Sequence, residues 1–214
     1  MDVISVLNIH PNYMSKDEVL NSEVYLKKIS FEKGKKYLIR ANSGKGKSSL
    51  LNFIFASNKN YFGKIFFDNL DIKDNSFEKI SSLRTKTISY IFQDFKLFTD
   101  LTVWENLKIK NNLTSFKSDI EIQSLLKKVG LDKKINDKVS QLSLGQRQRI
   151  AIIRSLCQPF DFLLMDEPFS NLDNDNIKIL TELINLEVKK QNAGIILTTL
   201  NNEYLFKYDK ILKL

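Results

Sequence analysis

Short apolar runs alternate with longer mixed segments along most of the chain. The runs that predict strands are 3–9, 24–31, 36–39, 64–68, 87–92, 160–165 and 194–198, with 64–68 and 87–92 expected to form a pair. Helices are predicted at 49–54 and 173–190, between successive strands. Strands that alternate with helices are typical of a parallel sheet covered on both faces, so the pattern predicts an α/β core.

The pattern changes between residues 95 and 159, where helical signals dominate. Apolar residues recur with helical spacing over 119–129, and Gly130 follows them as a stop signal. A shorter helical pattern covers 102–107. We therefore expect a single domain over 1–214, in which 1–92 and 160–214 form the α/β core and 93–159 form an inserted helical part.

Residues 41–49 read Ala-Asn-Ser-Gly-Lys-Gly-Lys-Ser-Ser and lie between a predicted strand and a predicted helix. Gly44 and Gly46 let the backbone wrap around an anion, so that successive N–H groups point at phosphates. Lys47 adds a positive charge, and Ser48 places a hydroxyl suited to Mg²⁺ at the helix start. The alternative is a glycine-bearing surface turn. The residues expected to contact a nucleotide here are Ala41, Asn42, Ser43, Gly44, Lys45, Gly46, Lys47, Ser48 and Ser49.

Two carboxylates, Asp166 and Glu167, end the apolar run that begins at Phe162. Ligands collect at the carboxyl ends of parallel strands, which places both side chains near a bound nucleotide. We expect Asp166 to hold Mg²⁺ through its water shell, and Glu167 to orient and deprotonate the water that attacks the γ-phosphate. The alternative is an acidic turn that caps a buried strand.

A second candidate anion site precedes the run 150–157. Ser143 stands directly before a predicted helix whose first turn offers free N–H groups, and Gly145 follows within that turn. Taken alone, this is only a capped helix. Its position in the chain, between the phosphate loop and the acidic strand, is what makes it informative about function.

Composition narrows the possible functions. The chain has 214 residues and is 43% hydrophobic, which is enough for a substantial core, and no apolar stretch approaches bilayer length. The net charge of +8 comes from lysines spread along the chain, so no nucleic-acid partner is expected. The single Cys157 is expected to pack in the core, and the single His10 lacks the neighbours of a zinc site. With no secretion signal visible, we expect a cytoplasmic location.

These motifs, in this order, resemble those of the ATP-binding cassette (ABC) ATPases over essentially the whole chain. The matching segments are the phosphate loop, a glutamine loop at 90–93, a signature at 142–146, the acidic strand and 170–173. The resemblance implies a P-loop NTPase (RecA-like) core with an antiparallel β subdomain and an inserted α-helical subdomain.

The resemblance also implies the cofactors and the partners. ATP and Mg²⁺ would bind in a head-to-tail dimer with a second cassette, in which Ser143, Gly145 and Gln146 of one chain close over ATP held by Lys47 of the other. Further implied roles are Gln93 as a magnesium ligand and sensor, Asp173 as a cross-dimer contact, and Tyr13 as the aromatic that stacks on adenine, with Tyr25 as its rival.

Three residues depart from the family pattern. Ala41 and Leu144 replace glycines, where a methyl or an outward side chain is expected to be tolerated. Leu200 replaces a histidine that contacts the γ-phosphate in the family, in the sequence Thr199-Leu200-Asn201. The loss of one such donor costs about 10²–10³ in rate, so weak basal turnover is expected.

The leading hypothesis is the ATPase subunit of a membrane transporter or related machine, peripheral on the cytoplasmic face and coupled to separate permease-like subunits. The phenylalanine-rich segment at 92–98 and the segment 101–106 look most like the lipoprotein-release, macrolide-export and cell-division cassettes. The alternative hypothesis is an ATP-gated dimerisation or signalling module with little hydrolysis. A soluble cassette in nucleic-acid repair or translation has little support, because the length leaves no room for a long coiled-coil insertion.

Overall fold

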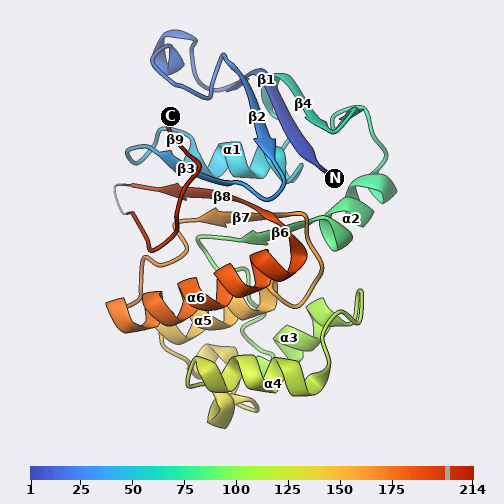
Figure 1. Ribbon diagram of the computed structural model, residues 1–214, viewed down its shortest axis with the longest axis vertical. Coiled ribbons are helices and arrows are strands. Elements are labelled where there is room, and N and C mark those ends of the chain that lie inside the picture. The colour runs from blue at the N-terminus through green and yellow to red at the C-terminus, as the bar shows by residue number, and fades with distance from the viewer. Residues whose placement is uncertain (201–202) are drawn as a thin grey trace.

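The structure is a computed structural model that describes residues 1–200 and 203–214. Two sheets form its framework (Figure 1). One is parallel, in the order β6-β7-β8-β3-β9, and the other is antiparallel, in the order β2-β1-β4-β5. The strands are β1 (Val3–Pro11), β2 (Lys28–Glu32), β3 (Lys36–Arg40), β4 (Tyr61–Phe67), β5 (Leu70–Asp71), β6 (Ile88–Ile91), β7 (Phe162–Asp166), β8 (Gly194–Thr199) and β9 (Lys210–Lys213).

The helices are arranged in layers around the parallel sheet. They are α1 (Lys47–Ile54), α2 (Phe77–Lys86), α3 (Val103–Asn111), α4 (Asp119–Lys128), α5 (Leu144–Ser155) and α6 (Asn174–Gln191). In Figure 1, α1 lies between the two sheets, and α5 and α6 cover the opposite face of the parallel sheet, with α3 and α4 beyond them. This is the α/β fold with an antiparallel sheet and inserted helices that the resemblance implied.

Strand β7 shows how the sheet divides the core. Phe162 and Leu164 pack with α1 and the antiparallel sheet, whereas Leu163 and Met165 pack with the helices on the other face. Successive side chains of a strand point to opposite faces, so a run that is apolar at every position belongs to a strand buried on both sides. The strand predicted at 160–165 is therefore confirmed, with its bounds shifted to Phe162–Asp166.

The helices of the inserted region share one N-terminal capping motif. Helices α3, α4 and α5 each begin with a capping box, in which a hydroxyl accepts a bond from the third helical N–H and that residue's side chain accepts one from the cap. The helices share a hydrophobic cluster with one face of the parallel sheet, which includes Ile91, Leu163 and Ile195. The domain boundaries at 93 and 159 stay a prediction.

Two strand predictions are wrong in part. The predicted pair at 64–68 and 87–92 does not exist, because β4 pairs with β1 and β5 in the antiparallel sheet while β6 pairs with β7 in the parallel sheet. The strand predicted at 24–31 begins only at Lys28. Val24 and Tyr25 are buried in the turn before it, and buried turn residues produce the same apolar signal as a strand.

The short strand β5, helix α2 and strand β9 were not anticipated from the sequence. Helix α2 buries only Ile80, and strand β9 buries only Leu212, so neither produces a clear apolar period. Among the described residues, no helix combines the length and the apolar character that a bilayer crossing requires.

Candidate active site

The phosphate loop connects the end of β3 to the start of α1, at the carboxyl edge of the parallel sheet. Strand β3 lies between the buried strand β8 and the edge strand β9, so the loop starts from inside the sheet. Gly44 has φ 78° and Gly46 has φ 85°, both in the left-handed region that a side chain disfavours. The structure thus explains why glycine stands at these two positions. The methyl of Ala41 is accommodated at the strand end, where the residue is buried.

The Lys47 side chain is nearly fully buried within this loop. Its ammonium donates to the carbonyl oxygens of Ala41 at 2.9 Å and Asn42 at 3.1 Å. A carboxylate oxygen of Glu167 lies 3.2 Å from the same nitrogen. A positive charge held at the centre of a glycine-rich turn is placed to meet an anion there.

Asp166 ends β7, next to the helix that starts at Lys47. The hydroxyl of Thr198 donates to Asp166 Oδ1 at 2.6 Å, which fixes the carboxylate. Burial raises the pKa of Asp166, and hydrogen bonding from the Ser48 and Thr198 hydroxyls opposes that rise. A cation beside this carboxylate would offset the cost of burying its charge.

Glu167 follows the strand in a left-handed conformation, with φ 44°. This region is uncommon for a residue other than glycine and costs of order 1–3 kcal/mol. The conformation is held by the bond from Glu167 N–H to Thr198 O at 3.1 Å and by the contact with Lys47. The chain thus aims this carboxylate at the phosphate loop rather than along the strand.

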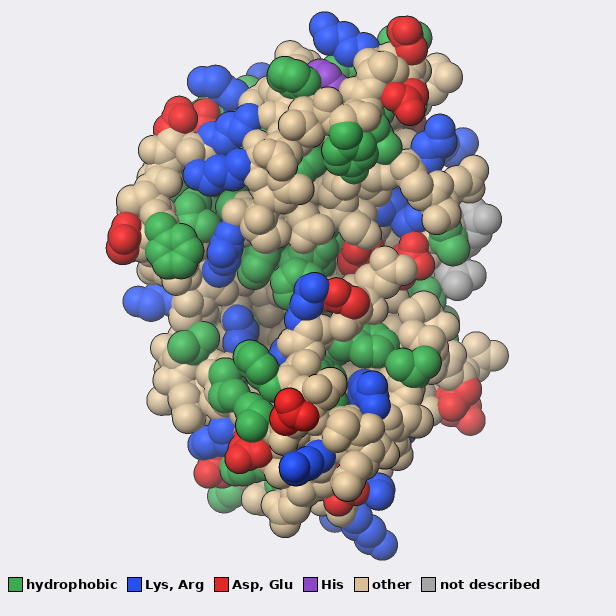
Figure 2. Space-filling view, turned by 180° about the vertical axis from the view of Figure 1, so that it is seen from behind, with side chains coloured by type: hydrophobic (Ala, Val, Ile, Leu, Met, Phe, Trp, Pro, Cys, Tyr) green, Lys and Arg blue, Asp and Glu red, His purple; other side chains and the backbone are tan. Residues whose placement is uncertain are grey.

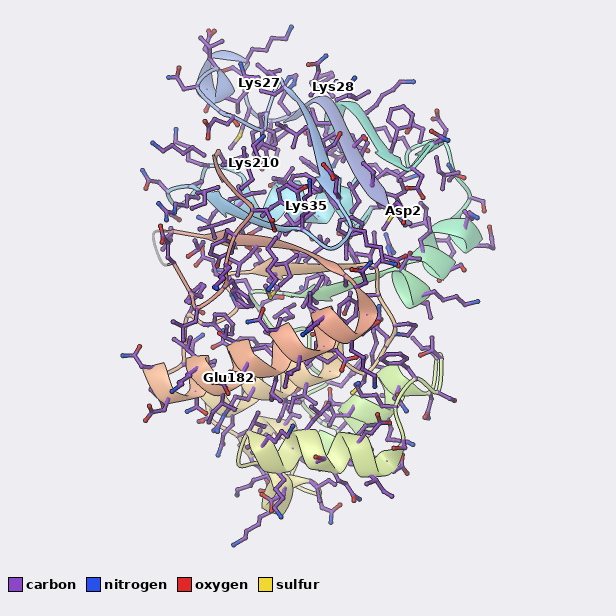
Figure 3. The ribbon with its side chains drawn as sticks, viewed as in Figure 1. Asp2, Lys27, Lys28, Lys35, Glu182 and Lys210 are labelled. Carbon is purple, nitrogen blue, oxygen red and sulfur yellow. The ribbon has the colours of Figure 1, made fainter. Side chains whose placement is uncertain are left out.

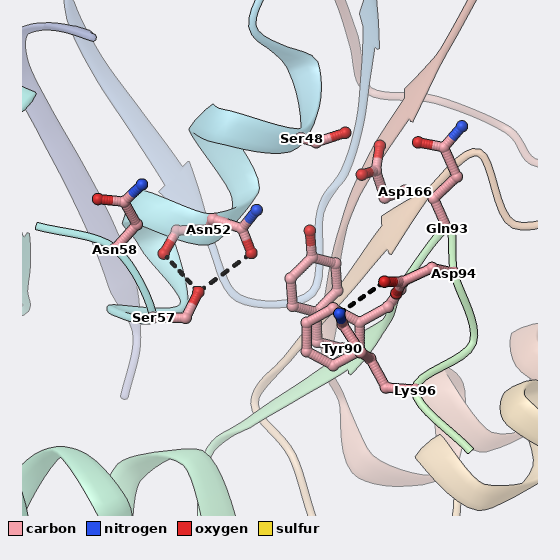
Figure 4. Close-up of a pocket in the computed structure, with 10 residues that line it drawn as sticks. Ser48, Asn52, Ser57, Asn58, Tyr90, Gln93, Asp94, Lys96 and Asp166 are labelled. Atoms are coloured by element: carbon pink, nitrogen blue, oxygen red, sulfur yellow. Dashed lines mark hydrogen bonds and ion pairs between the residues drawn. The ribbon is translucent and has the colours of Figure 1, made fainter. Parts of the chain in front are cut away.

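A cavity of about 830 Å³ opens beside the loop, and the three predicted magnesium residues Ser48, Gln93 and Asp166 line it together. Figure 4 shows their side chains near one another at one side of this cavity, with Tyr90 and Asp94 further along its wall. Gln93 follows β6 and is exposed. The structure therefore brings together residues that are far apart in the sequence.

The two candidate aromatics have different surroundings. Tyr13 is 61% exposed, and its hydroxyl shares a hydrogen bond of 2.5 Å with the Ser49 hydroxyl of the phosphate loop. Tyr25 is fully buried, and its hydroxyl donates to the Gly46 carbonyl at 2.7 Å. A ring without an exposed face cannot stack on a base, so only Tyr13 fits that role.

The signature residues lie at the start of α5. Ser143 is exposed and caps the helix, and Gln146 closes the capping box by accepting from Ser143 N–H at 2.9 Å. Leu144 is 58% exposed and points outward, which explains why a side chain is tolerated there. A Cβ on Gly145 would lie 3.0 Å from Asn171 O, so this position leaves little room for one. Within the described chain, Ser143 and Gly145 make no hydrogen bond or ion pair with 41–49.

Sequence reasoning missed Gln148, which connects the signature helix to the loop after Glu167. Its buried amide donates to Pro168 O at 2.7 Å and accepts from Asn171 N–H at 3.0 Å. Residues four apart share a helix face, so Gln148 lies on the same buried face as Ile152. A polar residue on an apolar helix face is the sequence signal that could have indicated Gln148.

Arg154 is a second missed residue, at the other end of α5. It donates to Lys96 O at 2.7 Å and to Phe95 O at 2.8 Å, where both residues have left-handed φ values. The segment after Gln93 is therefore attached to the signature helix.

Two further predicted positions lie at the edge of the site. Leu200 directly follows β8 and is 43% exposed, and its side chain offers no hydrogen-bond donor. Asn201, named with it in the sequence, lies outside the described residues. Asp173 caps α6 by accepting from Asn176 N–H at 2.8 Å.

Comparisons with known proteins identify the family of this chain. A family model described as ABC transporter matches residues 26–170. The chain is 38% identical to the lipoprotein-releasing system ATP-binding protein LolD of Buchnera aphidicola over 188 residues, which cover 85% of this chain and 80% of that protein. It is 30% identical to the protein of the same name from Desulfotalea psychrophila, over 100% of this chain and 96% of that one.

Solved structures show the same fold. A dimeric ATP-binding cassette in a post-hydrolysis state, bound to ADP and Pi, superposes with a TM-score of 0.78 at 25% identity, covering 92% of this chain and 88% of that chain. Another dimeric structure of the same cassette, described as a bacterial ABC transporter cassette, superposes with a TM-score of 0.76 at 26% identity, covering 91% of this chain and 87% of that chain. On the family match and the identity to these relatives, the chain belongs to the ABC transporter family.

Proposed function

We propose that this chain is an ATP-binding subunit that binds MgATP in a head-to-tail cassette dimer and hydrolyses it slowly to drive a separate membrane machine. The observation that carries the proposal is the position of the Lys47 ammonium, between the carbonyls of the phosphate loop and the Glu167 carboxylate. Family membership makes ATP the nucleotide expected at this loop.

The residues at the cavity fit a magnesium ion. Ser48, Gln93 and Asp166 offer a hydroxyl, an amide and a carboxylate oxygen, which are the ligand types that Mg²⁺ prefers. No group of three or more His, Cys, Asp or Glu side chains that could hold a metal occurs in the described part of the chain. An ion at this place would therefore complete its shell with phosphate and water oxygens, and it would neutralise charge that develops on the phosphates.

The remaining chemistry falls to the side chains of this chain. Lys47 binds the phosphates, and Glu167 orients a water molecule and accepts its proton. At the position of Leu200, no side-chain donor reaches toward the γ-phosphate, so one stabilising hydrogen bond of the transition state is missing. Hydrolysis is expected to be slow for this reason.

The dimer follows from the position of the signature. Ser143 and Leu144 are exposed and Gly145 is partly exposed, and the Ser143 side chain bonds only within its own capping box, so this helix start can meet a phosphate held by another chain. The solved relative that holds ADP and Pi is itself dimeric, which supports the same assembly here. Asp173 is a further residue proposed to contact the second cassette.

The membrane machine is proposed from the relatives and from the cavity. The names of the curated relatives assign them to a lipoprotein-releasing system, so a transporter or related machine with permease-like subunits is the proposed partner. The cavity beside Gln93 has aromatic walls, Tyr90 and Phe92, that could receive an apolar segment of such a subunit. A position on the cytoplasmic face of the membrane follows from this partnership.

The charged side chains in view do not gather in one place. On the face shown in Figure 2, Lys and Arg side chains are spread from top to bottom, with acidic side chains among them. Figure 3 shows Lys27 and Lys28 near the antiparallel sheet and Lys35 and Lys210 near the parallel sheet, while Glu182 lies on α6. A nucleic-acid site would gather such charge on one face.

The alternative function is an ATP-gated dimerisation module with little hydrolysis. The leucine at position 200 favours it, because that side chain has no donor. The retained Glu167, aimed at the phosphate loop, opposes it.

A mixing experiment tests the composite site. Lys47→Ala removes the phosphate-binding charge, and Ser143→Arg blocks the signature of the neighbouring chain. Each homodimer then has two defective sites, whereas a mixed dimer regains one intact site from Lys47 of one chain and Ser143 of the other. We expect single-turnover hydrolysis in the mixture and little in either variant alone. A mixture as inactive as its components would rule out the head-to-tail site.

A further inference from the structure

Tyr25 is a buried tyrosine that the proposed reaction does not use. It lies in the turn before β2, where the Ser22 hydroxyl accepts from Val24 N–H at 3.0 Å and from Tyr25 N–H at 2.8 Å. Its ring belongs to the hydrophobic cluster between the two sheets, which also contains Leu50 and Phe53 of α1. Contacts outside the phosphate loop therefore fix both the backbone and the ring of Tyr25.

The Tyr25 hydroxyl is directed at one atom of the phosphate loop. It donates to the carbonyl oxygen of Gly46 at 2.7 Å. Burial raises the pKa of Tyr25, so the hydroxyl keeps its proton and acts as a donor throughout the physiological range. A Cβ on Gly46 would lie 2.8 Å from this oxygen and 3.2 Å from the ring, so the ring packs directly against the glycine backbone.

The contact with the Gly46 carbonyl also sets the direction of the Lys47 N–H, because the two groups belong to the same peptide bond. No peptide bond among the described residues is cis, so the Gly46 carbonyl and the Lys47 N–H point in opposite directions on one plane. The carbonyl points along α1, where Leu50 N–H reaches it at 2.9 Å. The Lys47 N–H must then point out of the N-terminal end of α1, which is the end that forms the phosphate loop.

This orientation needs support because the preceding backbone is flexible. Gly44 and Gly46 frame Lys45, and a glycine cap gives α1 no side-chain hydrogen bond at its start. The Leu50 bond alone fixes the Gly46 carbonyl from one side. The Tyr25 hydroxyl adds a second, buried bond to the same oxygen.

We propose that Tyr25 is a positioning residue for the phosphate chain of the nucleotide, holding the Gly46–Lys47 peptide so that its N–H is already aimed at the phosphates. The proposal rests on the proposed ATP binding and deepens it. The loop recognises phosphates through its backbone, so the contribution of Tyr25 is shared by ATP and ADP and absent for adenosine. It acts on binding and leaves the chemical step at Glu167 unchanged.

The test compares two single-atom deletions in buried tyrosines. Tyr25→Phe removes the hydroxyl that bonds to Gly46. Tyr37→Phe is the matched control, because the Tyr37 hydroxyl is also buried and accepts a backbone bond from Glu32 N–H at 2.9 Å, away from the phosphate loop. Dissociation constants for ATP, ADP and adenosine are measured by calorimetry, and single-turnover hydrolysis is measured at saturating ATP.

Tyr25→Phe is expected to weaken ATP and ADP binding about threefold to tenfold, the size of one lost neutral hydrogen bond. Adenosine affinity and the saturated hydrolysis rate stay as in wild type, and Tyr37→Phe leaves every constant unchanged. Equal losses in the two variants, unchanged ATP affinity in Tyr25→Phe, or a matching loss of adenosine affinity would each overturn the positioning role. If wild type itself fails to bind ATP, the proposed function fails too, which is a separate and distinguishable result.

Discussion

The phosphate loop and the signature are both helix starts that we propose to bind phosphate, but they are held in different ways. The phosphate loop depends on side chains that are distant in the sequence, namely Tyr25 at Gly46 and Glu167 at Lys47. The start of the signature helix is capped by its own residues, because Ser143 and Gln146 bond reciprocally within one turn. The first is a site that only the whole fold assembles, and the second is a local, exposed motif available to a partner.

The largest expected effect is the loss of hydrolysis when the carboxylate beside the phosphate loop is changed. Glu167→Gln keeps the shape of the side chain but removes the base, so single-turnover hydrolysis should fall about 10²–10⁴-fold while ATP binding remains. Glu182→Gln, on the exposed face of α6, is the control and should hydrolyse as wild type does. If wild type also shows ATP-driven dimerisation without turnover, the alternative function as a gated module is favoured.

Leu200→His tests whether the proposed ATP site lacks a hydrogen-bond donor to the γ-phosphate. An imidazole there could hydrogen-bond the γ-phosphate in the transition state, so the rate should rise by about 10²-fold or more. Steady-state phosphate release measures this change. Leu205→His places the same side chain at another exposed leucine and should have no effect. A wild-type rate of tens per second, as expected for an efficient ATPase, would contradict the weak-turnover proposal.

Comparing two helix-cap variants separates the effect of the signature serine on stability from its effect on dimerisation. Ser143 and Ser118 begin α5 and α4 with equivalent capping boxes, and both are exposed. Replacing either by alanine should lower the free energy of unfolding by about 1 kcal/mol. Only Ser143→Ala should weaken ATP-driven dimerisation, measured by light scattering at increasing ATP. Equal dimerisation by both variants would show that the signature serves only as a cap.

The smallest effect is a pH dependence of stability at Asp166. Burial raises its pKa, so the folded chain holds this proton at pH values where the unfolded chain has lost it. The stability from Asp166 is therefore present below the unfolded pKa and is lost as the pH rises through the folded pKa. Asp166→Asn keeps an acceptor for Thr198 and removes the charge, so the variant should be more stable than wild type in neutral buffer and equal to it in acid.

Urea denaturation in acidic and neutral buffer measures the difference. Asp173→Asn provides a control of opposite sign, because the Asn176 backbone N–H and side chain hold the pKa of Asp173 below its usual value. That carboxylate adds stability above its unfolded pKa, which is lost as the pH falls through the folded value. A neutral-pH loss of stability in Asp166→Asn would show that the buried charge is favourable in the folded chain.

Much of the fold was predictable because it depends on local signals. The strand that ends at Asp166 was visible as a continuous apolar run, and the glycines of the phosphate loop stand where the backbone has positive φ. The pairing of strands was not predictable in the same way. Strand β4 joins β1 and strand β6 joins β7, and no periodicity within either strand specifies its neighbour.

The sequence by itself determined the order of the motifs and the chemical groups that they carry, because glycine conformations, helix caps and spaced charges act within a few residues of one another. Only the tertiary structure decided that Tyr25 is buried under Gly46 while Tyr13 remains exposed, and that Gln148 joins the signature helix to the loop after Glu167. These outcomes depend on which surfaces meet when the sheets and helices pack. Burial and hydrogen bonding across such distances are properties of the packed chain, which local patterns do not contain.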